Sequence, residues 1–298
     1  PATQGYLGGM GLPIIFSWFI GGLLSAGVAF VIGKICLGLR SDYLAISTLL
    51  ISGIVISVIK HEEWLSRGVK NVIGLKRPAP FEVNLQKSEW FMTLIDKIHF
   101  WAPTTKDVII SSSGIFVKLC FTIIFSITLL TLLYLSERAV NSPWGRMMRA
   151  IRDNETAAKA MGKNIVKQQL NIFMIGSAII GFAGAMLVTY DGLFTPSSYQ
   201  PLRYTFLIWV MVLLGGSGNN YGSILGAFVV WFIWIESAPI ALFIINFCTF
   251  FLEYNNPVKL HLIESVPYFR YLMMGVGLLL VMRYKPEGLL PEKKISFK

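Results

Sequence analysis

Charged side chains are scarce in this sequence. Only 14% of its 298 residues are Asp, Glu, Lys or Arg, whereas 54% are hydrophobic, and the mean hydropathy is +0.63. In soluble globular proteins roughly a quarter of all residues are charged, so this composition excludes an ordinary water-soluble domain. A membrane-spanning helix needs roughly 20 apolar residues, and apolar stretches close to that length recur along the chain. We therefore interpret residues 1–298 as a single transmembrane domain.

The residues that usually carry catalysis or hold metals are also few. The three histidines, His61, His99 and His261, are scattered, with no paired carboxylate or cysteine cluster at ligand spacing. The three cysteines lie in apolar surroundings and are predicted to be reduced packing residues. No phosphate-gripping GxxxxGK motif is present. The sequence therefore predicts a non-enzymatic chain with no catalytic residue, no metal site and no bound cofactor, and disfavours a membrane enzyme such as a lipid-modifying transferase.

The formal net charge of +10 does not indicate nucleic acid, because no basic stretch is interleaved with aromatic stacking residues. The basic residues lie in loops between apolar runs, and cytoplasmic loops retain Lys and Arg. Loop 136–168 and the tail from Arg283 to Lys298 are rich in them, so both are predicted to be cytoplasmic. Segment 61–113 mixes both charge signs and is predicted to be periplasmic.

The apolar runs predict an all-α fold, a polytopic integral membrane helical bundle with about seven spans. They cover residues 12–33, 43–60, 114–135, 169–190, 204–214, 221–236 and 268–284. The fifth run is too short to cross alone and ends at GGSGNN, residues 215–220, so we expect one discontinuous helix near 204–236. The chain begins at Pro1 without Met or a recognisable signal sequence, which indicates a trimmed N-terminus and room for further spans before it.

Two patterns leave alternatives open. EWFMTLIDKIHFW, residues 89–101, places four apolar side chains on one face, which fits either an amphipathic helix at the membrane interface or a small packed cap. Small residues spaced by four predict close helix packing, either within this chain or against a partner subunit or a substrate path. They are Gly21, Ser25 and Ala29, then Ser177, Gly181 and Ala185, then Gly218, Gly222 and Gly226.

A charged island, SPWGRMMRAIRDNETAAKAMGKN, occupies residues 142–164 between two apolar runs. One charged side chain at the bilayer centre costs about 2.5–3.5 kcal/mol, so this island must lie outside the lipid. Ser142 before Pro143 and Asn154 before Glu155 are N-cap signals, and Gly162 can end a helix in the left-handed conformation. The sequence therefore predicts two short helices within cytoplasmic loop 136–168.

The apolar residues of the island approximate one helical face, and its basic residues face elsewhere. Lipid headgroups or a groove on another protein can cover such a face. This face carries small alanines and no bulky aromatic residues, which favours a groove on another protein. Its methionines are flexible side chains that can fill such a groove. The apolar residues are Met147, Met148, Ile151, Ala158 and Met161, and the basic ones are Arg146, Arg149, Arg152 and Lys159.

The island also carries a family resemblance. It resembles the cytoplasmic coupling loop of ABC importer permeases, with Glu155, Ala157, Ala158 and Gly162 matching the Glu-Ala-Ala and downstream Gly pattern. More closely, the chain resembles the LivM-type permeases of branched-chain amino acid uptake systems. That resemblance extends through LRSDYLAISTLL (39–50), GSAIIGFAGAM (176–186), DGLFTPSSYQPLRYTFLIWVMVLLGGSGNN (191–220) and GLLLVMRYKPEGLLPEKK (277–294). Family members usually begin with further N-terminal spans that carry a Gly-Tyr and Gly-rich turn, and here only GYLGG at 5–9 resembles that turn.

The resemblance implies a multi-pass, lipid-embedded subunit of the bacterial inner membrane. It implies pairing with a second, LivH-type permease, two ABC ATPase subunits that use ATP and Mg, and a periplasmic solute-binding protein. The solutes it implies are branched-chain or related hydrophobic amino acids, with a urea or other small-solute permease of the same family as the alternative. An ion-coupled secondary transporter is disfavoured, because ionisable residues are scarce inside the spans. The expected ATPase-coupling residues are Arg149, Arg152, Asp153, Asn154, Glu155, Ala157, Ala158 and Gly162.

Two irregular, Pro-rich or Gly-rich segments adjoin the spans, at 191–201 and at 215–220. Irregular backbone near membrane depth is tolerated where it lines a cavity or is buried in protein. We therefore expect the solute path here, with an ordinary tight turn as the alternative at 215–220. The expected path residues are Thr195, Pro196, Ser197, Gly215, Gly216, Gly218, Asn219 and Asn220.

Overall fold

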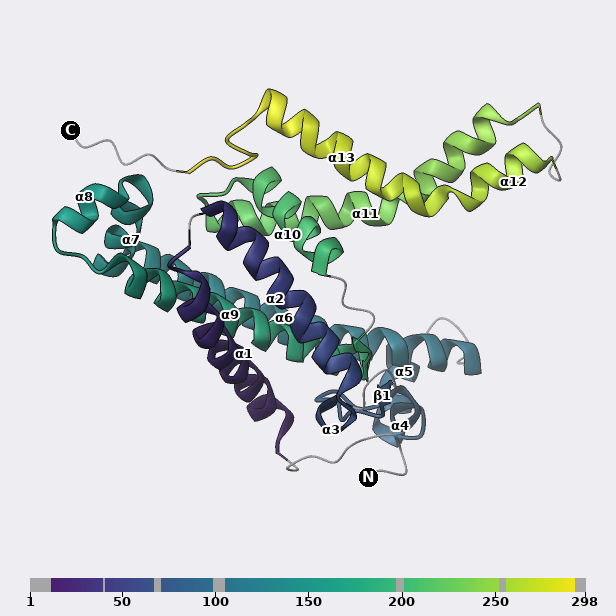
Figure 1. The fold of residues 1–298 in the computed structure, drawn as a ribbon. Coiled ribbons are helices and arrows are strands. Elements are labelled where there is room, and N and C mark those ends of the chain that lie inside the picture. Colours follow the sequence, from purple (N-terminus) through teal and green to yellow (C-terminus); the bar gives the residue numbers. More distant parts are fainter. Residues whose placement is uncertain are drawn as a thin grey trace. The chain divides into compact units, whose positions relative to one another are not determined.

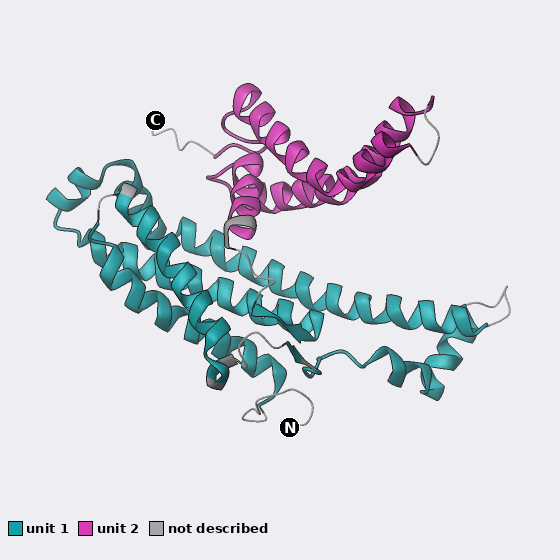
Figure 2. Cartoon of the chain, turned by 45° about the vertical axis from the view of Figure 1, so that its right-hand side comes forward, with its two compact units in different colours: residues 1–199 teal, residues 200–298 magenta. Residues whose placement is uncertain are grey.

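The computed structural model describes residues 12–39, 41–66, 71–98, 105–196, 201–251 and 256–292 (Figure 1). Two compact units divide the chain, residues 1–199 and residues 200–298 (Figure 2), and each is described by itself. The elements are α1 (Ile14–Cys36), α2 (Ser41–His61), α3 (Glu63–Ser66), β1 (Val72–Ile73), α4 (Glu82–Gln86), α5 (Glu89–Ile98), α6 (Lys106–Asn141), α7 (Pro143–Asp153), α8 (Glu155–Ala160), α9 (Ile165–Asp191), β2 (Leu193–Phe194), α10 (Pro201–Gly215), α11 (Asn220–Cys248), α12 (Pro257–Glu264) and α13 (Val266–Tyr284).

Six helices among the described residues are long and apolar enough to cross a membrane, namely α1, α2, α6, α9, α11 and α13. Each corresponds to one of the predicted runs. The remaining run, the fifth at 204–214, corresponds to α10, whose apolar part, Tyr204–Gly215, is shorter than a spanning helix. Large apolar side chains such as Leu23 and Ile180 stay exposed on these helices, as expected where lipid is the solvent. The prediction of an all-α polytopic membrane bundle is confirmed.

In the first unit, small residues hold α1 against α9. Gly21 lies opposite Ala185, and a side chain on Gly181 would collide with Ser25. The Ser25 hydroxyl donates a hydrogen bond to the Ser177 carbonyl oxygen at 2.8 Å. Small residues at every fourth position let two helix backbones approach this closely. Of the two alternatives left by the sequence, packing within the chain therefore accounts for this pair of stripes.

A buried polar contact fixes the register of the same two helices. The Trp18 indole Nε1 donates to the Thr189 hydroxyl at 3.0 Å, and both side chains are buried. Because an indole N–H without a partner is costly away from water, this pairing disfavours sliding of α1 along α9. The Trp18 ring also meets Phe182 edge-on, with ring centres 6.0 Å apart.

The segment before α6 forms a small packed cap. Helices α4 and α5 bury Leu85, Phe91 and Ile95 against Val117 and Phe121 of α6. Phe91 and Ile95 are only 1% and 2% exposed. For 89–98 the packed-cap alternative is therefore confirmed, and residues 99–101 of that motif lie outside the described part of the chain.

In the second unit, the chain breaks where predicted, but the two segments fold back on each other and do not continue as one discontinuous helix. Helix α10 ends at Gly215 and α11 begins at Asn220. The two helices then pack against each other, because side chains on Gly222 and Gly226 would collide with the α10 backbone at Gly215 and Met211. The shared core of α10, α11 and α13 contains Leu207, Val210, Leu214, Val230, Trp234 and Met274.

Replacing Gly181 tests the seam between α1 and α9. In Gly181→Leu the new side chain overlaps Ser25, so we expect the free energy of unfolding to fall by about 1–3 kcal/mol, the usual cost of overpacking. Gly184→Leu on the same helix is the control, because nothing lies within 4 Å of the position its Cβ would take. Thermal unfolding of the purified variants measures the difference. Equal losses in the two variants would contradict this account of the seam.

Candidate functional site

The charged island folds as the sequence predicts. The Ser142 hydroxyl accepts a hydrogen bond from the Gly145 N–H at 3.3 Å and so caps α7. The Asn154 Oδ1 accepts from the Ala157 N–H at 3.0 Å and caps α8. Gly162, with a φ of 76°, takes the left-handed conformation just after α8. Both predicted short helices are confirmed, and three local signals set where they begin and end.

Helix α7 is fixed to the end of α6 by contacts that the sequence did not indicate. Arg149 Nη2 donates to the Val140 carbonyl at 3.2 Å, and Arg146 Nη1 donates to the Asn141 carbonyl at 3.4 Å. Cations favour the C-terminal carbonyls of a helix, where the dipole is negative. Gly145 permits this approach, because any side chain there would collide with the Val140 carbonyl oxygen.

The other side of the island is fixed to α9. The Asn164 Oδ1 caps α9 by accepting from the Lys167 N–H at 3.0 Å. Ile151 of α7, Ala158 of α8 and Ile165 of α9 form a buried apolar cluster, against which Met147 and Met148 pack. Because one cluster joins three helices, loop 142–164 is a compact body set between α6 and α9.

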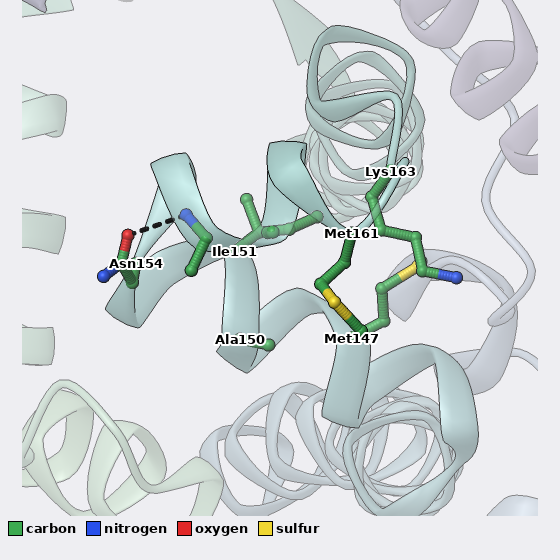
Figure 3. Close-up of a pocket in the computed structure, with 8 residues that line it drawn as sticks. Met147, Ala150, Ile151, Asn154, Met161 and Lys163 are labelled. Atoms are coloured by element: carbon green, nitrogen blue, oxygen red, sulfur yellow. Dashed lines mark hydrogen bonds between the residues drawn. The ribbon is translucent and has the colours of Figure 1, made fainter.

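An open apolar hollow of about 380 Å³ lies between α7 and α8 (Figure 3). Figure 3 shows Met147, Met161 and Lys163 together at one end and Asn154 at the other. Met161 is 81% exposed. The hollow is lined by Met147, Ala150, Ile151, Asn154, Ala157, Ala158, Met161 and Lys163.

The expected coupling residues occupy three different places on this body. Asn154, Ala157 and Ala158 line the hollow, whereas Arg149 points to the end of α6. Arg152 and Asp153 form an exposed ion pair at 3.1 Å. Exposed Glu155 lies in the first turn of α8, and Gly162 follows its end. Exposed pairs of this kind add little stability, and the two side chains are 55% and 66% exposed.

The expected solute-path residues belong to both units. Thr195 and Pro196 lie in the first unit, and Ser197 lies outside the described residues. The Thr195 hydroxyl donates to Asn71 Oδ1 at 2.9 Å, beside the antiparallel pairing of β1 with β2. This end of the first unit is therefore held by a long-range contact with segment 71–73.

The glycine turn of the second unit is covered by the segment that follows α13. The Leu289 N–H donates to the Leu214 carbonyl and the Leu290 N–H to the Gly215 carbonyl, both at 2.9 Å. Gly216 has a φ of 117°, and a side chain there would collide with the Leu290 carbonyl oxygen. These contacts occupy backbone groups that a passing solute would otherwise need, which favours the tight-turn alternative.

Asn219 and Asn220 begin α11. The Asn219 Oδ1 accepts from the Tyr221 N–H at 3.0 Å and from the Gly222 N–H at 3.4 Å, so its side chain is the N-cap. Asn220 is the first residue of the helix. The sequence motif GGSGNN therefore combines a turn with a helix cap, as Asn commonly does.

The sequence did not indicate two arginines whose contacts with Asp191 and Trp234 join residues distant in the chain. Arg77 Nη2 donates to the Asp191 carbonyl at the end of α9, at 3.4 Å, and its guanidinium pairs with Glu82 at 3.5 Å. The Arg270 guanidinium of α13 lies 5.5 Å from the centre of the Trp234 ring. An Arg inside an apolar run is itself a signal of function. Within the described ranges no three His, Cys, Asp or Glu side chains are grouped to hold a metal.

Comparison with known proteins agrees with these features. The family described as branched-chain amino acid transport system / permease component matches residues 2–282. A probable branched-chain amino acid transport permease protein LivM from Methanocaldococcus jannaschii is 30% identical over 278 residues, covering 92% of this chain and 68% of that protein.

Two further relatives are the high-affinity branched-chain amino acid transport system permease proteins LivM of Salmonella typhimurium and Escherichia coli. Each is 25% identical over 283 residues, which is 94% of this chain and 58% of the relative. No solved structure matches. The resemblance read from the sequence is thus confirmed, and this chain belongs to the permease-component family of branched-chain amino acid transport systems.

Proposed function

We propose that this chain is a transmembrane permease subunit of an ATP-driven ABC importer for branched-chain, hydrophobic amino acids. The observation that carries the proposal is the capped helix pair α7–α8, anchored on two spanning helices in a chain whose family match extends over residues 2–282. The names of its relatives support the choice of solute. A permease has no need of catalytic groups of its own.

The proposed assembly contains a second, LivH-type permease, two ABC ATPase subunits that use ATP and Mg, and a periplasmic solute-binding protein. In this arrangement the chain lies in the inner membrane, with loop 136–168 and the C-terminus in the cytoplasm. The excess of Lys and Arg at these two places supports that orientation. The absence of a GxxxxGK motif from the sequence supports assigning ATP to other subunits.

Coupling follows from how loop 142–164 is held. Hydrogen bonds from Arg146 and Arg149 fix it to α6, and the cluster around Ile151 and Ile165 fixes it to α9. A displacement of the loop by a closing ATPase therefore moves both helices, since packed elements shift as rigid bodies. The small-residue seam extends that displacement from α9 to α1.

The proposed solute path retains Thr195, Pro196 and Ser197 together with the turn at 215–220. Its support is irregular backbone beside spanning helices, the arrangement that membrane transporters use at substrate sites. In the second unit this backbone includes Gly216 at a φ of 117°. The covering segment at 289–290 is then a part of the path's wall that would have to move for solute to reach the Gly215 carbonyl.

Variants of the loop should separate ATP hydrolysis from uptake. In Gly162→Pro the ring forbids the φ of 76° seen here, and Glu155→Lys places a cation at the positive end of α8. We expect the amount of solute moved per ATP hydrolysed to fall about tenfold or more, because the displaced loop no longer transmits ATPase closure to α6 and α9. Reconstituted vesicles containing the complete complex provide both measurements.

Thr156→Ala is the control for these loop variants, because Thr156 is exposed on α8 and does not line the hollow. It should leave the ratio unchanged. Normal uptake per ATP in both Gly162→Pro and Glu155→Lys, at normal membrane levels, would argue against coupling through this loop.

Variants of the glycine turn test the proposed path. Asn219→Leu removes the α11 cap, which costs about 0.5–2 kcal/mol, and Gly216→Val places a branched residue at a φ of 117°. We expect the uptake rate at saturating solute-binding protein to fall by a much larger fraction than the amount of membrane-inserted protein does. Asn256→Leu is the control, since Asn256 caps α12 in the same way and is not in the proposed path. Normal uptake in both turn variants would mean that the turn is structural.

A further inference from the structure

Arg270 occupies a position of α13 that otherwise faces protein. Val266 and Met274, four residues before and after it, are buried, and Leu278 packs against the core of the second unit. Residues spaced by four lie on one face of a helix. Arg270 therefore belongs to the face of α13 that packs against α10 and α11.

The same arginine lies inside the span. It is four residues after Val266, the first residue of α13, which places its Cα about 6 Å along the helix. A charged side chain costs about 2.5–3.5 kcal/mol at the bilayer centre. Those that occur within spanning helices commonly mark ion or solute pathways, and they pair with an opposite charge or a polar group. The partner of Arg270 is therefore the question to answer.

Trp234 of α11 is one partner, but it satisfies the guanidinium only in part. Arg270 Cζ lies 5.5 Å from the centre of the Trp234 ring. This cation–π contact stabilises the charge and supplies no oxygen acceptor for the N–H groups. The Nε of Arg270 is buried and has no hydrogen-bond partner among the described residues. Because a buried N–H without an acceptor is costly, the arrangement favours an acceptor from outside this set.

The described carboxylates of the second unit are not placed to supply that acceptor. Glu236 follows Trp234 by two residues, about 200° around α11, so it lies on a different side of that helix. Glu264 is exposed in the last turn of α12, and Glu287 and Glu292 follow the other end of α13. Within the described part of this unit, no ion pair joins any of them to Arg270.

Arg270 lies at the end of the second unit where α10 begins. A side chain on Gly226 would collide with the Met211 carbonyl oxygen, and the short turn between α10 and α11 makes these helices antiparallel. Eight residues further along α11, at Trp234, the same register reaches residues 201–204 of α10. Pro201 is the last residue of the irregular segment 191–201, where we expect the solute path. The arginine and the end of that segment are therefore at one end of this unit.

We propose that Arg270 binds the carboxylate of the amino acid that is being transported, with Trp234 as the platform that holds the guanidinium. Two parallel N–H donors of an arginine match the two oxygens of a carboxylate, and the buried Nε is one such donor. All α-amino acids carry this group, so the contact serves solutes with different side chains. The proposal rests on the proposed function for the identity of the solute, and it adds a residue that the solute touches.

A lipid phosphate offers similar oxygens but fits the position less well. Arginines that serve headgroups extend along exposed helix faces towards the interface. Arg270 instead shares its face with buried Val266 and Met274, and its guanidinium lies against Trp234, which is 8% exposed. In the proposed orientation α13 ends in the cytoplasm, so the carboxylate would meet Arg270 near the periplasmic entrance.

Uptake by the complete complex is the first test. In vesicles with saturating solute-binding protein, we expect uptake of labelled leucine to fall about tenfold or more in Arg270→Gln, because the charged fork is lost. Arg270→Lys should lose less, since it keeps the charge but not the two parallel donors. Arg283→Gln is the control: Arg283 is also on α13 and lies 5.9 Å from an aromatic ring, that of Tyr284, but at the opposite end of the helix. Equal uptake by Arg270→Gln and Arg283→Gln would contradict the proposal.

Direct binding keeps the test decisive if Arg270→Gln also disturbs packing. The purified complex, without the solute-binding protein and in a maltoside detergent that carries no phosphate, is titrated with three probes. Leucine has both charged groups, isocaproate lacks the ammonium group, and isoamylamine lacks the carboxylate. We expect Arg270→Gln to weaken leucine and isocaproate about tenfold or more and isoamylamine less than about twofold, because only the first two present a carboxylate. An equal loss for all three probes would mean that Arg270 is structural.

Addition of phosphatidylglycerol distinguishes the lipid source. We expect it to leave the affinity of the unaltered complex for leucine unchanged. If Arg270→Gln abolishes binding of this lipid and leaves leucine binding intact, the site belongs to a lipid phosphate and the proposal is overturned.

Failure of this proposal and failure of the proposed function give different results. If the unaltered complex transports leucine with ATP and Arg270→Gln binds all three probes normally, only the role of Arg270 is wrong. If the unaltered complex transports no branched-chain amino acid, the proposed function fails, and binding of isocaproate still decides whether Arg270 holds a carboxylate. Binding of neither leucine nor isocaproate by the unaltered complex would overturn the carboxylate site.

Discussion

Exclusion of charge from hydrocarbon is the constraint on which the rest of this structure depends. Segment 142–164 cannot enter the bilayer, so it has to fold outside it without the help of lipid. It does so with side-chain caps at Ser142 and Asn154 and with a cluster shared with α9. The same constraint leaves the spanning helices to pack through small residues and few polar contacts, as in the seam between α1 and α9.

The sequence predicted the helices and their local ends well, because both depend on neighbouring residues. Apolar runs mark the spans. Ser142, Asn154 and Gly162 set helix ends through contacts with residues less than one helical turn away. Helix α6 is longer than hydropathy predicted: the apolar run covers 114–135, whereas the helix extends over Lys106–Asn141. Hydropathy detects only the part that suits lipid, whereas the backbone continues as helix into polar surroundings at both ends.

What the sequence did not predict are contacts between distant residues. Arg149 was expected at a partner surface, and its guanidinium lies on the Val140 carbonyl. The Gly-rich, irregular turn at 215–220 was expected to line the solute path, but Leu289 and Leu290 donate hydrogen bonds to its start from the segment after α13. Neither periodicity nor local motifs contain that information. The helix pair of the candidate site was thus predictable, and its anchoring was not.

Helix α9 is closed at both ends, by Asn164 at Ile165 and by the left-handed Gly192 with Arg77 on the Asp191 carbonyl. A helix of 27 residues is about 40 Å long, and unprotected termini of such a rod normally fray. Here both ends are held, so amide hydrogens of the terminal turns should exchange with solvent more slowly than those of a helix with uncapped ends. A displacement of one end of α9 is then transmitted to the other end, because the helix has no frayed turn and moves as a rigid body.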